Sequence, residues 1–142
     1  MKTLTLLVSL ATLAALSSGL LVSCSKGGDY NKSVDVKAMV QQLKNQDKDQ
    51  RQKACIALAE AGPYAAGAVP ALIEALKDPD NLTKSLAAYA LGCVGPKASQ
   101  AVPALKECLN TPDPEVTPSV INALRAIAPK AASGLKVENV AQ

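Results

Sequence analysis

The sequence predicts an all-α fold, an α-solenoid of about three 33-residue helix-turn-helix repeats. Two observations support this prediction: a period of 33 residues, and within each period an apolar spacing typical of two helices. Three rows that begin at Asp35, Ala68 and Ala101 align without a gap. Identical residues recur in the columns Val36/Val69/Val102, Leu43/Leu76/Leu109, Leu58/Leu91/Leu124 and Pro63/Pro96/Pro129. Repetition at this spacing indicates stacked units that bury their apolar faces against one another.

Each row contains two predicted helices joined by a turn, most clearly in the second row. Its first helix is predicted by apolar residues at i, i+3, i+4 and i+7, namely Val69, Leu72, Ile73 and Leu76. The turn contains Asp80 and Asn81, either of which can cap the next helix. That second helix is expected over residues 82–94. Gly95 and Pro96 end it, because glycine tolerates positive φ and proline cannot continue a helix.

The outer rows repeat this pattern with small differences. In the first row the second helix is expected from about residue 50 to residue 61. In the third row Pro118 fits only the first turn of a helix, so we expect that helix to start near Glu115 or later. Residues 134–142 are too short for another hairpin and are interpreted as a C-terminal cap or tail. The predicted repeat domain therefore covers residues 35–133, divided as 35–67, 68–100 and 101–133.

Residues 1–23 have the features of a secretory signal peptide. Lys2 provides a positive charge, residues 4–16 are mostly apolar, and small residues follow. The sequence at 21–24, Leu-Val-Ser-Cys, resembles the lipobox of bacterial lipoproteins, in which the cysteine becomes the lipid-modified first residue. The resemblance implies lipidation at Cys24 and a membrane anchor, with residues 24–34 as a lipidated tether. The alternative is an ordinary signal peptide that releases a soluble secreted protein.

Charge and cysteine content exclude several classes of function. The chain has a formal net charge of +3 and no histidine. Its one cluster of basic residues, between positions 37 and 53, is interrupted by aspartates, so we expect no nucleic-acid partner. Cys55 shares a column with Ala88 and is expected in the core. A Cys93–Cys108 bridge is possible but not predicted, and the cysteine spacing matches no zinc motif, so neither a metal nor a cofactor is expected.

Two segments carry a resemblance to a known family: AVPALIEALKDPD at 68–80 and LAAYALGCVGPKA at 86–98. They resemble HEAT repeats, in the short bacterial form related to phycobilisome-lyase-type repeats. The resemblance implies that each turn carries an Asp and, four positions later, a basic residue, and that these residues stack as ladders along the solenoid, cap helices and pair between repeats. The acidic column is complete, whereas the basic column weakens along the chain. The predicted ladder residues are Asp47, Asp80, Asp113, Arg51 and Lys84.

The resemblance also implies a scaffold whose inner surface is formed by the second helices. We therefore expect a non-enzymatic envelope lipoprotein that binds a protein or peptide partner through polar residues of these helices. The candidate partner-binding residues are Tyr89, Arg125, Arg51, Lys84, Glu60 and Asn122. Tyrosine and arginine are enriched at interface hot spots, which places Tyr89 and Arg125 first. For each residue the alternative is ordinary solvated helix surface.

Two other functions remain open at this point. One is a lyase-like or chromophore-attachment factor related to the phycobilisome-lyase branch. The absence of histidine, of a nucleophile elbow and of a glycine-rich phosphate loop argues against catalysis. The other is a structural module whose open repeat ends stack on copies of itself, since three repeats are about the minimum for a stable solenoid.

Overall fold

The computed structural model describes residues 34–133, and all structural statements below concern this part of the chain. The predicted signal peptide, Cys24, the tether up to residue 33 and the C-terminal cap or tail lie outside the described residues. Within residues 34–133 the chain forms helices and turns without a strand, which confirms the all-α prediction.

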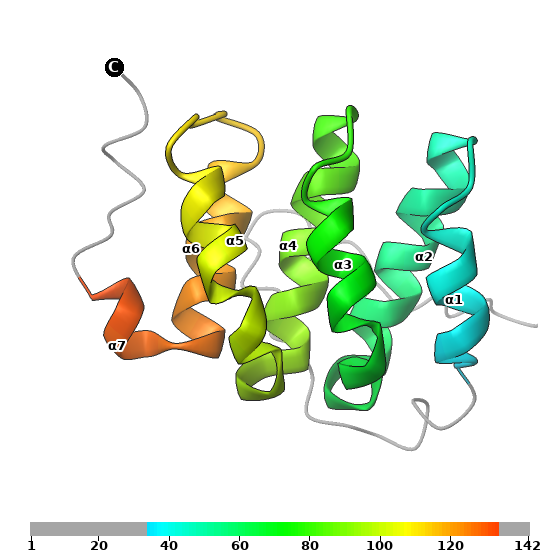
Figure 1. Cartoon of the computed structure of the whole chain (residues 1–142), viewed down its shortest axis with the longest axis horizontal. Helices are drawn as coiled ribbons and strands as arrows, with labels where there is room; N and C mark the ends of the chain where they lie inside the picture. The colour runs from blue at the N-terminus through cyan, green and yellow to red at the C-terminus, as the bar shows by residue number, and fades with distance from the viewer. Residues whose placement is uncertain (1–33, 134–142) are drawn as a thin grey trace, which may run out of the picture.

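Three helical hairpins follow one another along the chain (Figure 1). Each pairs a short first helix with a longer second helix: α1 (Val36–Gln42) with α2 (Lys48–Ala61), α3 (Val69–Ala75) with α4 (Asn81–Val94), and α5 (Val102–Cys108) with α6 (Thr117–Ile127). Two 3₁₀ segments, η4 (Gly62–Ala68) and η5 (Gly95–Ala101), connect the hairpins, and α7 (Pro129–Ala132) follows the last one. The predicted α-solenoid of three repeats is thus confirmed.

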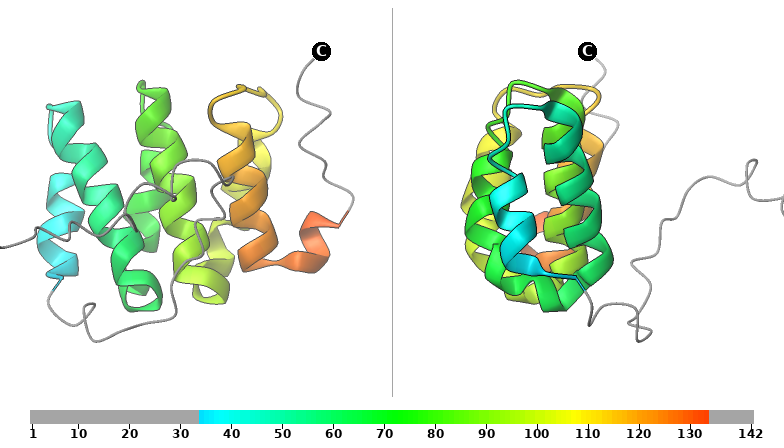
Figure 2. Two further views of the ribbon diagram at one scale, coloured as in Figure 1. Left: turned by 180° about the vertical axis from the view of Figure 1, so that it is seen from behind. Right: turned by 90° about the vertical axis from the view of Figure 1, so that its right-hand side faces the viewer.

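The hairpins stack side by side into two layers (Figure 2). The second helices form one layer, in which α2 packs along α4 and α4 packs along α6. The first helices form the other layer and contact their own second helix and the 3₁₀ segments. All turns within hairpins lie at one edge of the stack, and η4, η5 and α7 lie at the opposite edge (Figure 1).

The second helices of the first two repeats begin at aspartate caps. The Asp47 side chain accepts a hydrogen bond from the Asp49 backbone N–H at 2.9 Å and caps α2. The Asp80 side chain accepts from the Thr83 N–H at 2.8 Å and caps α4. Such caps satisfy backbone donors that the first turn of a helix leaves without a partner.

Glycine ends the second helices of the first two repeats. Gly62 has φ 55° and Gly95 has φ 71°, a region that residues with a Cβ rarely adopt. In the third repeat, Ala128 stands at this position with φ −145°, so α6 ends in an extended residue and α7 follows. Helix α6 begins at Thr117 with Pro118 in its first turn, as the sequence predicted.

The core lies between the two layers and is built from the repeating columns. Leu58, Leu91 and Leu124 are fully buried, and Leu72 and Leu105 are fully buried opposite them. Alanines fill much of the remaining space, which allows neighbouring helices to approach closely. A chain with no Phe or Trp can therefore form a continuous core, since each repeat packs only against its neighbours.

One helical run, Lys48–Ala75, is by length and composition apolar enough to cross a membrane. It consists of α2, η4 and the whole of α3, and the chain reverses direction between the two helices (Figure 1). Its apolar residues, among them Leu58, Val69 and Leu72, are buried in the core of the stack. Its composition is thus explained by packing within the solenoid.

Candidate functional site

All six predicted partner-binding residues belong to the second helices, with Arg51 near the start of α2. Glu60 belongs to α2, Lys84 and Tyr89 to α4, and Asn122 and Arg125 to α6. Glu60, Asn122 and Arg125 are exposed, whereas Lys84 and Tyr89 are half-buried. Because α2, α4 and α6 pack in sequence, this layer offers one continuous surface. We call Ile56, Glu60, Tyr89, Asn122 and Arg125 the second-helix face.

Ile56 is a member of this face that sequence analysis missed. Its side chain is 45% exposed, which is unusual for a large aliphatic residue in the middle of a helix. It occupies the same repeat position as Tyr89 and Asn122, so the three residues mark one row across the layer. The alignment of Ile56 with Tyr89 and Asn122 could have indicated that its side chain is exposed. An isoleucine in a helix is, however, ordinarily expected in the core.

Tyr89 lies at the centre of this row and retains its proton. Partial burial raises the pKa of the Tyr89 phenol, and the negative charge of Glu60 raises this pKa further. The hydroxyl is therefore a neutral hydrogen-bond donor at physiological pH, attached to a flat apolar ring. Such a side chain suits partner contact, because it combines a large apolar area with one directed polar group.

Arg51, the sixth predicted partner-binding residue, is engaged within the fold. Its Nε and Nη2 donate to the two carboxylate oxygens of Asp78 at 2.6 and 3.0 Å. Its Nη1 donates to the backbone carbonyls of Asn45 and Gln46 at 2.8 and 2.9 Å. The Arg51 and Asp78 side chains are 13% and 7% exposed. Arg51 therefore joins the first turn to the second, and its guanidinium is occupied by these contacts.

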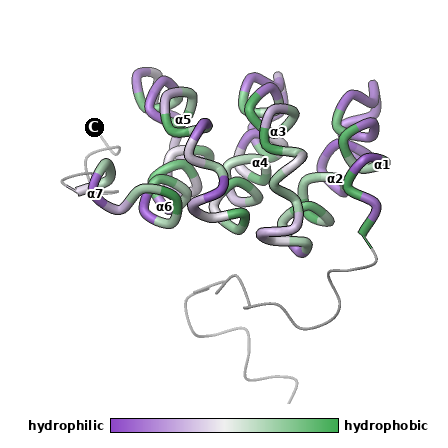
Figure 3. Tube along the Cα trace, turned by 60° about the horizontal axis from the view of Figure 1, so that its bottom comes forward, coloured by the Kyte–Doolittle hydropathy of each residue, from purple (hydrophilic) through white to green (hydrophobic). Residues whose placement is uncertain are grey.

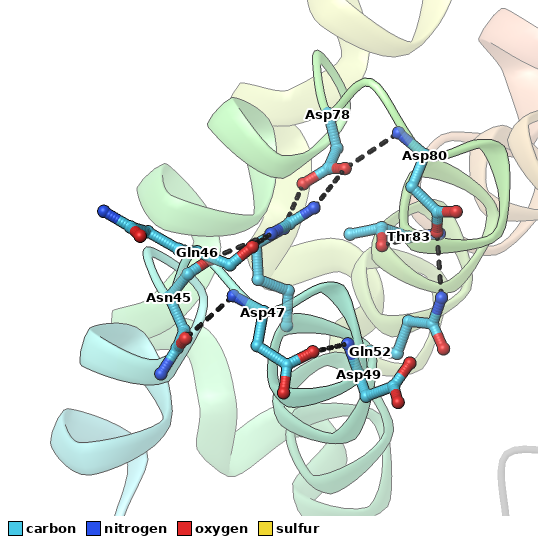
Figure 4. A network of polar contacts seen from close by, with 9 residues as sticks. Asn45, Gln46, Asp47, Asp49, Gln52, Asp78, Asp80 and Thr83 are labelled. Atoms are coloured by element: carbon cyan, nitrogen blue, oxygen red, sulfur yellow. Dashed lines mark hydrogen bonds and ion pairs between the residues drawn. The ribbon is translucent and has the colours of Figure 1, made fainter.

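A second network surrounds Asp80 in the same turn (Figure 4). Gln52 Nε2 donates to Asp80 Oδ2 at 2.9 Å, and Thr83 donates to the same oxygen through its backbone N–H and its hydroxyl, both at 2.8 Å. These bonds stabilise the ionised carboxylate and lower the pKa of Asp80 to about 2, with the Gln52 bond as the largest cause. Asp80 is thus a structural anion rather than a proton donor.

The predicted ladder forms in a modified way. The acidic column caps helices as expected at Asp47 and Asp80, and the Asp113 side chain accepts from the Glu115 N–H at 2.8 Å. The pairing differs, because Arg51 binds Asp78 rather than a member of the acidic column. Lys84 Nζ donates to Asn81 Oδ1 at 3.1 Å, a contact within its own helix.

A groove lies on the opposite layer, between α1 and α3, with a volume of about 410 Å³. Its walls are mainly apolar, with charged groups at the turn end; the lining residues are Val40, Leu43, Lys44, Gly67, Pro70, Ala71, Glu74, Ala75 and Asp78. It contains none of the predicted partner-binding residues. The second-helix face and this groove are therefore separate surfaces.

The cysteines of the repeat region do not form the bridge left open by the sequence. Cys108 is a free thiol, so no Cys93–Cys108 disulfide exists. Cys55 is fully buried, and burial raises its thiol pKa to about 12, which leaves it unreactive. Between residues 34 and 133, no three acidic, histidine or cysteine side chains converge to hold a metal ion.

Comparison with known proteins identifies the repeat. A family model described as HEAT repeats matches residues 36–125, which span all three hairpins. No curated protein and no solved structure matches the chain. The matched region and the stacked hairpins agree, and the chain therefore belongs to the HEAT-repeat family, whose repeats commonly mediate protein–protein interaction.

Proposed function

We propose that this protein is a non-enzymatic lipoprotein of the bacterial cell envelope that presents its second-helix face to a protein or peptide partner. The observation that carries the proposal is the row formed by Ile56, Tyr89 and Asn122 across three packed helices. An exposed isoleucine stands beside a half-buried tyrosine there, with Glu60 and Arg125 nearby in sequence. Interfaces have this composition: an aromatic and aliphatic centre with a polar rim.

The geometry of the second-helix face favours binding over catalysis. Tyr89 keeps its proton as an ordinary phenol does, and its pKa is raised further by burial, while Asp80, in the turn before α4, is held ionised by three hydrogen bonds. The Cys55 thiol is buried away from any substrate. A general acid or base needs a pKa near the working pH, and none of these groups has one. These three groups therefore fit a binding surface and its supporting fold better than a proton-transfer site.

The proposed location in the cell envelope is supported by the sequence that precedes the repeat domain. An apolar stretch at residues 4–16 precedes Leu21-Val22-Ser23-Cys24, which resembles a lipobox. Lipidation of Cys24 would hold the solenoid at the periplasmic side of a membrane through a short polar tether. A soluble secreted form is the alternative, and lipid analysis of the purified protein separates the two.

The partner surface is tested by site-specific photocrosslinking in cells. A benzoylphenylalanine at Ile56 is expected to give adducts with a discrete partner, while the same group at Lys106, exposed on α5, is expected to give none. Alanine at both Tyr89 and Arg125 is expected to abolish the adducts from position 56. Adducts of equal yield from both positions, or from position 106 alone, would place the interface elsewhere.

The anchor is tested by Cys24→Ala, with Cys108→Ala as the matched cysteine control. The Cys24 variant is expected to lose incorporation of labelled fatty acid and to leave the membrane fraction. The Cys108 variant is expected to keep both. Retention of the label after Cys24→Ala would show that the modified residue is another one.

A further inference from the structure

The edge of the solenoid opposite the hairpin turns has its own composition. It consists of η4, η5 and α7, and we call these three segments the linker edge. They carry Lys97 and Lys130 and no acidic residue. Tyr64 occupies the same repeat position as these two lysines, and its side chain is 68% exposed. The three residues therefore recur once per repeat along one edge.

The opposite edge is different in charge. Most of the acidic side chains of residues 34–133 lie in or beside the hairpin turns: Asp47, Asp49, Glu74, Asp78, Asp80, Glu107, Asp113 and Glu115. Figure 3 shows the hydrophilic residues concentrated in these turns. Near the linker edge the acidic groups are Asp35, which caps α1, and Glu60, in the last turn of α2. The turns also carry Lys44, Lys48 and Lys77, so charges of both signs meet at the turn edge, whereas the three linker segments carry lysines alone.

The chain enters the fold beside the linker edge. Val34 and Asp35 precede α1 at the end of the stack where η4 lies, and α1 contacts η4 (Figure 1). Ten residues, Ser25–Val34, lie between Cys24 and Asp35. Helix α4 has 14 residues and separates the two edges by about 21 Å. A lipid at Cys24 would therefore be joined to the fold at the linker edge and not at the turn edge.

The side chains of the linker edge match the chemistry of a bilayer surface. Lysines can lay their apolar stems along the surface and direct their amino groups to phosphates. Tyrosine is enriched at the membrane–water interface, where its ring meets the acyl boundary and its hydroxyl remains hydrated. Each contact is weak, but a tether raises the effective concentration of the edge at the membrane.

We infer that the linker edge, through Tyr64, Lys97 and Lys130, rests against anionic lipid headgroups and orients the solenoid on the membrane. This inference rests on the proposed lipid anchor at Cys24. In this orientation the hairpins stand with their turns away from the bilayer. The second-helix face then points sideways, accessible to a partner in the same envelope layer.

The test uses the lipidated full-length protein and exploits the absence of tryptophan from the sequence. Tyr64→Trp places a single tryptophan on the linker edge, and Gln46→Trp places one on the turn edge, where the Gln46 side chain is exposed. Each protein is reconstituted in vesicles of phosphatidylglycerol or of phosphatidylcholine that contain brominated lipid. Flotation reports the anchor, and quenching of tryptophan fluorescence reports contact with the bilayer.

The expected result is quenching of Trp at position 64 that exceeds quenching at position 46 by about twofold or more on phosphatidylglycerol, with a smaller difference on phosphatidylcholine. Lys97→Gln with Lys130→Gln is expected to remove most of this difference. The matched pair Lys44→Gln with Lys77→Gln, on the turn edge, is expected to leave it unchanged. Circular dichroism confirms that each variant is folded.

Two contrary outcomes are distinguishable. Flotation with equal quenching at both positions, or with stronger quenching at position 46, would overturn the orientation and leave the lipid anchor intact. Failure to float, together with a mass that lacks a lipid, would overturn the anchor and the orientation with it. Quenching that is insensitive to the linker-edge lysines and to lipid charge would show that headgroup charge does not hold the edge.

Discussion

The two junctions between neighbouring hairpins use equivalent helices but different contacts. At the junction of α2 and α4, Arg51 and Gln52 reach from one repeat to Asp78 and Asp80 of the next. At the junction of α4 and α6, Asn81 Nδ2 donates to Asp113 Oδ2 at 2.9 Å, and the Ser85 and Ser119 hydroxyls are 2.7 Å apart. The first junction thus has a charged network over the turns, whereas the second junction has neutral donors and short side chains.

Single substitutions between repeats explain this difference. The position of Asp78 is Thr111 in the third repeat, and the position of Arg51 is Lys84 in the second, so the bidentate pair has no counterpart at the second junction. There the helices also approach closely: a Cβ built on Gly92 would lie 3.2 Å from the Cα of Ala123. The buried columns set the stacking, while the contacts that reinforce it vary from junction to junction.

Helix α4 belongs to both junctions, so its core residue gives the largest expected effect. Leu91→Ala removes a fully buried side chain and should lower the free energy of unfolding by about 2–5 kcal/mol. Urea denaturation followed by circular dichroism measures this loss. Leu82→Ala on the same helix, at a side chain that is 53% exposed, serves as control and should cost about 0.5 kcal/mol or less. Equal losses for the two variants would contradict the assigned core.

The close approach at the second junction predicts the next largest effect. Gly92→Val would push branched carbons against Ala123 and should lower the free energy of unfolding by about 1–3 kcal/mol. Gly67→Val is the control, because a Cβ at Gly67 meets nothing within 4 Å. Thermal denaturation of both variants compares them. An unchanged Tm for Gly92→Val would show that α4 and α6 can separate without loss of packing.

The charged network at the first junction predicts a moderate effect. Arg51→Met leaves the nearly buried Asp78 carboxylate without its cation and should lower Tm by a few degrees. Lys84→Met, at the equivalent position of the second junction, removes only the contact with Asn81 and should change Tm less. Equal shifts in Tm would show that the two junctions do not differ in this respect.

The smallest expected effect is a pH dependence specific to the first junction. The folded-state pKa of Asp80 is about 2, below the ordinary value of 3.8, so the ionised carboxylate stabilises the fold at pH values above about 4. That contribution is lost as the pH falls from about 4 to about 2, because the unfolded state then binds the proton more readily. Gln52→Leu removes the largest cause of the lowered pKa.

The Tm difference between wild type and Gln52→Leu should therefore shrink as the pH is lowered from about 5 to about 2. Ser85→Ala, at the equivalent position of the second repeat, should show a Tm difference from wild type that does not depend on pH in this range. A constant difference for Gln52→Leu would mean that Asp80 is not stabilised by this hydrogen bond.

Much of the fold follows from the sequence for identifiable reasons. The 33-residue period places Leu58, Leu91 and Leu124 in equivalent positions, and all three are buried. Gly62 and Gly95 end helices because the required φ is positive, and Asp80 begins one because a carboxylate satisfies free N–H groups. These effects are local or strictly repeated, so a single chain reveals them.

The candidate site was less predictable. The sequence marked Tyr89 and Arg125 as surface candidates but omitted Ile56, because an isoleucine in a helix is expected to be buried. It also placed Arg51 both in the ladder and among the partner-binding candidates, whereas the fold directs that side chain to Asp78, 27 positions away. Which residue a long side chain reaches depends on the offset between neighbouring repeats, and periodicity does not specify that offset.

The sequence by itself determined the all-α solenoid, the number of repeats and the caps at both ends of α4, because these depend on local backbone chemistry and on repeated apolar spacing. The tertiary structure decided which polar groups meet across each junction and which side chains remain exposed on the second-helix face. It also brought charges of both signs together at the turn edge and aligned Tyr64, Lys97 and Lys130 along the linker edge. The physical reason is that these properties arise from distances between repeats, which are fixed only when the helices pack.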